Sequence, residues 1–237
     1  MRYILMSLLV WLSANVSGQD GNYEIDIAKI GDNLYLYLSY SDYQGQKISA
    51  NGLLVDAGDS VLMIDTPWGN DQTIQLLDWI DENLQKPLAL VVITHAHEDR
   101  IGGIGVIHER NIRTIGSKLT AVYALRWGYQ PPKETFEKEQ IIKIGHHKIE
   151  LFYPGPGHTV DNSVVYIPDY NLLHGGCFVK SAEAKSLGNI ADADLGSWPA
   201  SLQAVQNRYP DIKTVIPGHG STNSGAIENT LKLLNKK

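Results

Sequence analysis

The sequence has one cysteine in 237 residues, so it excludes an internal disulfide. It has no lysine-rich or arginine-rich block, and its formal net charge is −6 at pH 7, which argues against nucleic acid as a partner. Beyond the N-terminus it has no long apolar run, and low-complexity segments and proline-rich or serine-rich linkers are also absent. We therefore expect one globular domain that is monomeric and has no stable membrane association.

The N-terminus has the features of a secretory signal in their usual order. A positively charged start precedes an apolar run over residues 3–12, which is too short to span a bilayer. Small residues follow, with Val16 and Gly18 at the −3 and −1 positions of a cleavage site. The sequence predicts a signal peptide over residues 1–18, a mature domain over residues 19–237 and a periplasmic location. The alternative is a buried N-terminal strand or helix.

Short alternating runs between residues 23 and 65 predict antiparallel strands. The clearest of these runs are residues 34–38, 52–55 and 61–64. A polar segment with a central glycine, residues 41–49, is typical of a hairpin. Residues 88–94 are a continuous apolar run rich in β-branched side chains, which predicts a strand buried on both faces.

Helices are expected between and after these strands. The first is expected to be capped by Asn70 or Asp71, and its apolar face is formed by Ile74, Leu77, Ile80 and Leu84. The others are expected at residues 117–127, after Ser197 with Pro199 in the first turn, and at residues 225–234. Further strands are expected within residues 141–152, 164–167, 172–173 and 214–216. Each half of the chain therefore runs strands, helix, buried strand and polar loop, and ligands bind beyond the carboxyl ends of such strands.

The strongest chemical signal is THAHEDR, which directly follows the apolar strand expected at residues 88–94. His95 and His97 are two residues apart, a spacing that lets both imidazoles meet one metal, and Asp99 can reach an adjacent site. The alternative, a polar turn with histidines by chance, is a poor explanation for three potential ligands within five residues.

Three more loops deliver one potential ligand each after a glycine-rich approach. His158 lies in GPGHT, Cys177 follows GG, and His219 lies in PGHG. Alone, each histidine is usually a surface residue, and the cysteine is either a small buried hydrophobe or a metal-bound thiolate. Together the loops predict two sites, of which His95, His97 and His158 form the first. Asp99, Cys177 and His219 form the second.

The motifs HAHEDR, GPGHT, GGCFVK, LGNIADAD and PGHG resemble those of the class B metallo-β-lactamases. The subclass they resemble has a three-histidine zinc site and an Asp-Cys-His zinc site. The resemblance covers the chain from about residue 25 to the last helix. It implies an α/β fold, an αββα sandwich of two similar halves with a di-zinc site at one edge. It also implies that residues 19–237 are the catalytic domain.

Arg100 distinguishes this chain from the glyoxalase II-like and ribonuclease Z-like members of the same fold, which resemble H-x-H-x-D-H. An arginine stays protonated and cannot replace that last histidine as a ligand, so the second site needs Cys177. We expect Arg100 to support the loop by hydrogen bonding rather than to be an ordinary surface arginine. The four other histidines, His108, His146, His147 and His174, are read as structural or solvated.

The resemblance implies three roles in substrate binding. Lys180 pairs with the carboxylate of a β-lactam, and Asn189 donates to the carbonyl oxygen as negative charge develops there. Trp68 and the hairpin segment form an apolar wall and a mobile flap. The corresponding alternatives are a solvated lysine, a turn residue beside Gly188 and ordinary core packing.

The implied activity is zinc-dependent hydrolysis of the β-lactam amide in penicillins, cephalosporins and carbapenems, which confers antibiotic resistance. A hydroxide shared by two zinc ions attacks the carbonyl carbon, and Asp99 orients it while Asn189 stabilises the oxyanion. One alternative is another hydrolase of this fold, a lactonase or thioesterase. The other is a periplasmic zinc-binding protein without catalysis.

Overall fold

The computed structural model of the chain describes residues 23–222 and 225–236. The signal peptide expected over residues 1–18 lies outside the described residues. Two sheets form the centre of the molecule. The first has seven strands in sequence order: β1 (Asp26–Gly31), β2 (Leu34–Tyr43), β3 (Gln46–Asp56), β4 (Val61–Ile64), β5 (Leu88–Ile93), β6 (Arg113–Ser117) and β7 (Glu134–Phe136). The second has five strands in the order β12 (Thr214–Pro217), β11 (Leu172–Gly176), β10 (Val164–Ile167), β9 (His147–Phe152) and β8 (Glu139–Ile144).

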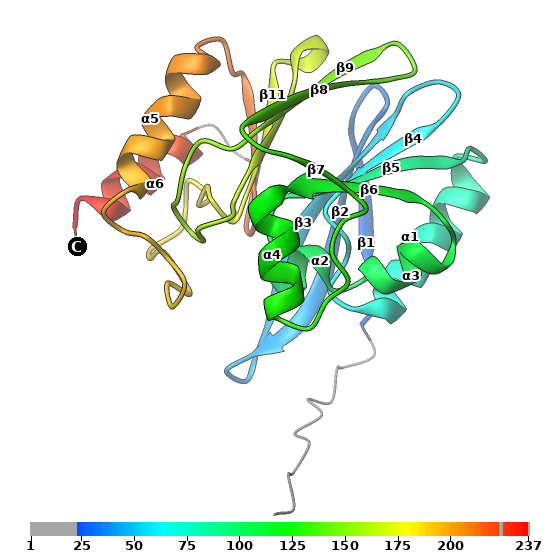
Figure 1. Cartoon of the computed structure of the whole chain (residues 1–237), viewed down its shortest axis with the longest axis horizontal. Coiled ribbons are helices and arrows are strands. Elements are labelled where there is room, and N and C mark those ends of the chain that lie inside the picture. Colours follow the sequence, from blue (N-terminus) through cyan, green and yellow to red (C-terminus); the bar gives the residue numbers. More distant parts are fainter. Residues whose placement is uncertain (1–22, 223–224, 237) are drawn as a thin grey trace, which may run out of the picture.

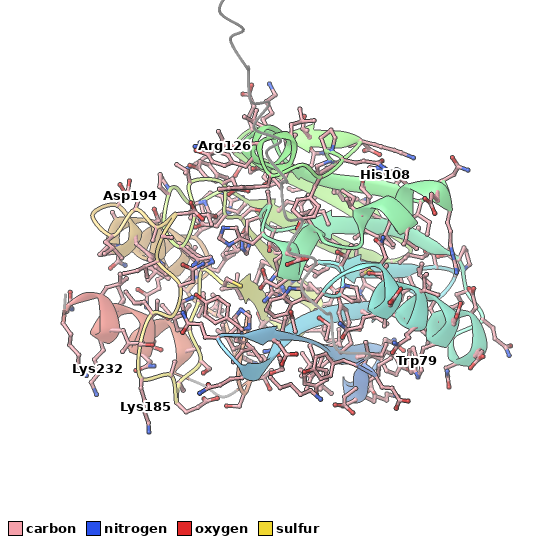
Figure 2. All side chains as sticks on the ribbon, turned by 90° about the horizontal axis from the view of Figure 1, so that it is seen from below. Trp79, His108, Arg126, Lys185, Asp194 and Lys232 are labelled. Carbon is pink, nitrogen blue, oxygen red and sulfur yellow. The ribbon has the colours of Figure 1, made fainter. Side chains whose placement is uncertain are left out.

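Helices cover the outer face of each sheet, so the molecule has four layers (Figure 1). On the first sheet lie α1 (Asn70–Asn83), α2 (Glu98–Ile101), α3 (Ile104–Glu109) and α4 (Lys118–Arg126); on the second lie α5 (Trp198–Arg208) and α6 (Ala226–Leu234). A short 3-10 helix, η1 (Pro168–Tyr170), joins β10 to β11. Figure 2 shows Trp79 and His108 toward the α1 and α3 end, and Lys185 and Lys232 toward the α6 end. The predicted αββα sandwich is confirmed.

Successive side chains of β5 are buried on opposite faces of the first sheet, which places this strand at the centre of the fold. Leu90 and Val92 pack into the core between the two sheets, whereas Val91 and Ile93 pack against the helices of the first sheet. Burial of each such side chain stabilises the fold by about 1.5–3 kcal/mol. The prediction of a strand buried on both faces is confirmed, and its fixed position places the loop that follows it.

The hairpin expected at residues 41–49 is confirmed as the far end of β2 and β3. The two strands pair antiparallel from Leu34↔Val55 to Tyr43↔Gln46. Gln44 and Gly45 form the turn, both with positive φ, at 51° and 75°. This hairpin projects beyond the rest of the sheet at the lower edge of the sandwich (Figure 1).

Three local predictions were wrong. The residue before α1 is Gly69, at φ +84°, so neither Asn70 nor Asp71 caps the helix. Ile74 is 40% exposed, because the buried face of α1 runs through Gln72, Thr73, Leu76, Leu77 and Ile80. Ser197 is the residue before α5 as expected, but its side chain caps no helix amide, because the hydroxyl donates to Asp194 at 2.9 Å. Within the described residues, no helix is long and apolar enough to cross a membrane.

Candidate metal centre

The predicted ligand loops meet at one edge of the sandwich because they follow strand ends. His95 comes two residues after β5, Cys177 directly follows β11, and His219 comes two residues after β12. His158 lies in the loop between β9 and β10, and Asp99 in the short helix α2. The strands β11 and β12 are parallel, so their carboxyl ends carry their loops to the same edge.

Backbone hydrogen bonds join the two sheets at this edge. The Ser163 amide donates to the Thr94 carbonyl at 2.8 Å, and the Asn51 amide donates to the Gly218 carbonyl at 2.8 Å. A Cβ atom on Gly218 would lie 2.6 Å from the sulfur of Cys177, so this position requires glycine. These contacts fix the ligand loops against both sheets.

The three histidines of the first predicted site face one another. Their rings stand edge to face, with centroids 4.8 Å apart for His95 and His97, 5.1 Å for His95 and His158, and 5.3 Å for His97 and His158. Ligand atoms of His95, His97 and Asp99 lie within 4.8 Å of one another, as do those of His95, His158 and Cys177. The structure therefore brings the predicted set together, with His95 in contact with members of both sites.

The second predicted site is a compact triad. The sulfur of Cys177 lies 3.1 Å from Oδ2 of Asp99 and 3.3 Å from Nε2 of His219. The distance from His219 Nε2 to Asp99 Oδ2 is also 3.3 Å. One thiol, one carboxylate and one imidazole at these distances form a donor set that suits zinc.

Burial and neighbouring charges set the protonation of the ligands. Burial lowers the pKa of His95 and of His158 well below the usual range, and nearby charges on His97 and Lys180 act in the same direction. Burial opposes ionisation of Asp99, but Arg100 and His219 outweigh it and hold its pKa well below the usual range. Neutral imidazole and ionised carboxylate are the forms that bind metals.

The pKa of His219 is shifted in the opposite direction to those of His95 and His158. Burial lowers its pKa, but the negative charges of Cys177 and Asp99 outweigh this and raise the pKa of His219 to about 10. The triad therefore attracts positive charge, and a metal cation would take the place of the His219 proton.

Two buried nitrogen atoms test whether these residues fit a metal. Among the described side chains, Nε2 of His95 and Nδ1 of His158 are buried without a hydrogen-bond partner. A buried polar atom without a partner costs about 1–3 kcal/mol. Both atoms belong to residues of the histidine cluster, and a metal held there would supply a partner for an imidazole nitrogen. The residues present therefore fit a metal.

Arg100 lies beneath the triad and is fully buried. Its Nε is paired with Asp99 at 3.0 Å, and one terminal nitrogen donates to the Cys177 sulfur at 3.1 Å and to the Gly218 carbonyl at 2.6 Å. The other donates to the Asn51 carbonyl and lies 3.6 Å from Asp65. Arg100 is thus a buried support for the triad, not a surface arginine.

Several residues that support the ligands were not identified from the sequence. Asp192 lies 3.0 Å from Nε2 of His97, so it fixes that ring and leaves Nδ1 for a metal. The Ser49 carbonyl accepts from Nδ1 of His219 at 2.7 Å. Asp192 lies in the LGNIADAD motif and Asp65 directly follows an apolar strand, but neither position indicates its partner.

Asp65 is one of the supporting residues that the sequence did not identify. It has φ +65°, and its carboxylate accepts from the Thr94 amide at 2.8 Å and lies 3.0 Å from His174. His174 and His147 are buried and bound to Asp65 and Asp169, and His108 contacts Thr114 and Gln130. These contacts agree with the reading of His108, His147 and His174 as structural.

The three predicted substrate-binding residues lie in different surroundings. Trp68 is half-buried, with its ring centroid 6.3 Å from that of His219 and its Nε1 3.4 Å from Glu98. Lys180 is 8% exposed, and its ammonium lies 5.5 Å from the centroid of the buried Trp198 ring. Asn189 is exposed, and its Oδ1 accepts from the Ala191 amide at 3.1 Å.

Comparison with known proteins decides the family. Residues 46–219 match the metallo-β-lactamase superfamily. The chain belongs to this superfamily. It is 40% identical over 211 residues to a metallo-β-lactamase type 2 of Bacillus sp. (strain 170), which covers 89% of this chain and 82% of that protein. It is 31% identical over 237 residues to a metallo-β-lactamase type 2 of Elizabethkingia meningoseptica, covering 100% of this chain and 95% of the relative.

Solved structures give the same family. The metallo-β-lactamase from Pontibacter korlensis has a TM-score of 0.87 and 39% identity, covering 90% of this chain and all of that one. DIM-1 metallo-β-lactamase exposed to ceftazidime has a TM-score of 0.86 and 36% identity, covering 92% and 99% of the two chains. The predicted family, its fold and an enzyme of the metallo-β-lactamase type are confirmed, and metal binding in general is supported.

Proposed function

We propose that this metallo-β-lactamase hydrolyses the ring amide of penicillins, cephalosporins and carbapenems with two zinc ions, and so confers antibiotic resistance. The observation that carries the proposal is the adjacency of the three-histidine cluster to the triad of Asp99, Cys177 and His219. The names of the relatives support β-lactam hydrolysis, and ceftazidime was the compound to which DIM-1 was exposed.

Two ligand sets would hold the metal ions. His95, His97 and His158, whose rings face one another, would hold the first, with one coordination position open to water or substrate. Asp99, Cys177 and His219 would hold the second. When bound, zinc lowers the pKa of water toward neutrality and polarises a carbonyl group. The donor set favours zinc over magnesium, because thiolate and imidazole are softer ligands than the oxygens that magnesium prefers.

The side chains around the cluster would bind and orient the substrate. Asp99 stays ionised beside Arg100, so it can accept a hydrogen bond from the attacking water and aim it at the carbonyl carbon. Asn189 uses Oδ1 in its own turn, which leaves its Nδ2 group to donate to the developing oxyanion. The Lys180 ammonium would pair with the substrate carboxylate, and Trp68 would supply an apolar wall.

The proposal includes export. Residues 1–18 would direct the chain to the periplasm and be removed, and residues 19–237 would act there as a monomeric catalytic domain. A zinc-bound thiolate at Cys177 fits that compartment, because its buried sulfur is protected from disulfide exchange.

Steady-state hydrolysis by purified residues 19–237 tests the activity. We expect turnover of a penicillin, a cephalosporin and a carbapenem at saturating zinc. The reaction is monitored by the loss of β-lactam absorbance. Hydrolysis of lactones or thioesters without β-lactam turnover would instead assign the site to another hydrolase of this fold. Tight zinc binding without any hydrolysis would leave a zinc-binding protein.

The Asp192→Asn substitution is expected to weaken binding of zinc by about 10–100-fold, because an amide holds and polarises the His97 ring less well than a carboxylate. The measurement is a competition titration of the metal-free protein against a chromophoric chelator, which needs no substrate.

Asp194→Asn is the matched control, two residues along the same loop. The carboxylate of Asp194 accepts from the Ser197 amide and hydroxyl, at 2.9 Å each, at the start of α5. This variant removes the same charge without touching a ligand, so its zinc affinity should stay near that of the wild type. Equal affinities for the two variants would contradict the role of Asp192.

A further inference from the structure

The hairpin of residues 41–49, whose Ser49 carbonyl accepts from the His219 ring, extends beyond the sheet that supports it. β1 pairs with β2 only as far as Asp26↔Leu38, whereas β2 continues to Tyr43. Beyond Leu38, the described residues provide no strand on that side of β2. Strand β4 pairs with β3 only from Leu53 onward, so the outer part of β2 and β3 is a two-stranded ribbon with two open edges, and such a ribbon is marginally stable in water.

A side chain replaces the missing strand at Tyr40. Oε1 of Gln72 accepts from the Tyr40 amide at 2.7 Å, and Nε2 of Gln72 donates to the Tyr40 carbonyl at 2.7 Å. Two bonds to the amide and carbonyl of one residue are the pattern of a hydrogen-bonded pair in an antiparallel sheet. We call this pair of hydrogen bonds the Gln72 clamp. Gln72 is 6% exposed, so water does not compete for these bonds.

The same amide group holds Trp68. Nε2 of Gln72 also donates to the Trp68 carbonyl at 2.9 Å, and the Trp68 amide donates to the hydroxyl of Ser39 at 3.1 Å. The backbone of Trp68 is thus tied to two adjacent residues of β2. Because the Trp68 ring lies beside His219, displacement at the root of the hairpin would also displace this wall of the metal centre.

The contacts toward the tip of the ribbon are exposed. The hydroxyl of Tyr23 donates to Asp42 at 2.8 Å, and Nζ of Lys47 lies 3.8 Å from the centroid of the Tyr40 ring. Residues 42–47 are all exposed, and contacts of this kind in water are weak. At the root of the hairpin, the buried Gln72 amide therefore restrains β2, while the Ser49 carbonyl on the paired strand β3 accepts from His219 at 2.7 Å.

We propose that Gln72 is a positioning residue that joins the root of the substrate-covering hairpin to Trp68 and thereby sets the affinity for substrate. This inference rests on the proposed function, in which residues 41–49 cover the substrate. The hairpin and Trp68 bind the non-reacting parts of a substrate, so loosening both removes binding that the ground state and the transition state share. The effect should therefore fall on KM and leave kcat nearly unchanged.

The Gln72→Glu substitution tests this with little change of shape. It keeps an acceptor for the Tyr40 amide but faces the Tyr40 and Trp68 carbonyls with an oxygen, so both donated bonds are lost. We expect KM for a penicillin to rise about tenfold, the equivalent of one to two ordinary hydrogen bonds, with kcat within about twofold of wild type. Zinc content per chain should not change.

Gln75→Glu is the matched control on the same helix. Oε1 of Gln75 accepts from the Ile25 amide at 3.1 Å, and its Nε2 donates to the Tyr23 carbonyl at 3.0 Å. The chemistry is the same, but these hydrogen bonds hold the segment before β1, which touches the hairpin only through exposed contacts such as the one from Tyr23 to Asp42. Its KM should remain near that of the wild type.

Trypsin provides a readout that needs no activity. Lys47 is exposed near the tip of the hairpin, so its rate of cleavage, followed by mass spectrometry on the zinc-loaded protein, reports opening of the ribbon. We expect cleavage at Lys47 to be several-fold faster in Gln72→Glu than in Gln75→Glu. If the wild type hydrolyses no β-lactam, the proposed function fails, while faster cleavage at Lys47 still supports the clamp.

Two results would overturn the inference. One is equal KM and equal Lys47 cleavage in the Gln72 and Gln75 variants. The other is a fall in kcat at constant KM, which would place Gln72 in the chemical step. Where Gln72→Glu does not fold, Gln72→Met removes all three hydrogen bonds without a buried charge and is measured in the same way.

Discussion

Replacement of Arg100 by methionine is expected to lower the free energy of unfolding of the metal-free protein by about 3–5 kcal/mol, the cost of removing one partner of a buried ion pair. Methionine fills most of the volume but removes the guanidinium that is paired with the Asp99 and Asp65 carboxylates. It also removes the side-chain donor to the carbonyls of Asn51 and Gly218, of which the Gly218 carbonyl keeps the Asn51 amide. Urea denaturation at pH 7, with chelator present, measures the change.

Arg113→Met provides the comparison for this experiment. Arg113 pairs with Glu134 at 2.8 Å, but both side chains are about half exposed, at 56% and 41%. An exposed pair of this kind contributes about 0–1 kcal/mol. If Arg100→Met lost no more stability than Arg113→Met, Arg100 would not be the electrostatic support of the triad.

The sequence predicts those parts of the fold and site that depend on local order along the chain. The continuous apolar run at residues 88–94 predicted a strand buried on both faces, observed as β5, and the HAHEDR motif predicted ligands at the end of that strand. Four ligand loops that each follow a strand also predicted a common edge, because parallel strands end together. Each of these signals lies within a few residues of the strand end that it marks, and tertiary packing agrees with it.

The supporting contacts could not be predicted, because their partners lie far apart in the chain. Gln72 bonds Tyr40 across 32 residues, and Asp192 contacts His97 across 95. A glutamine on a helix and an aspartate in a loop are ordinary surface residues by composition, so nothing local marks them. The prediction that Ile74 is buried was wrong for a related reason. The helix presents to the sheet the face centred on Thr73 and Leu77, and tertiary packing determines which residues are covered.

Removal of both metal ions is expected to lower the rate of β-lactam hydrolysis on the order of a thousandfold or more. The reason is that activation of water and polarisation of the carbonyl together supply several kcal/mol of transition-state stabilisation. Hydrolysis of a carbapenem is measured before chelation, after chelation and after addition of zinc. Zinc should restore the rate, and magnesium, which prefers oxygen ligands, should not.

Cys177→Ser separates the two predicted sites. Serine keeps the size of the side chain, but its hydroxyl stays protonated at neutral pH and is a poor zinc ligand, so the triad loses its thiolate while the three-histidine cluster stays intact. We expect bound zinc to fall from two ions to one per chain at limiting zinc, with a fall in rate of at least about tenfold. The buried sulfur also lies 3.1 Å from Arg100, so the stability of the metal-free variant is measured alongside zinc content. Full zinc occupancy at an unchanged rate would remove Cys177 from the metal centre and leave the second ion without its predicted ligand.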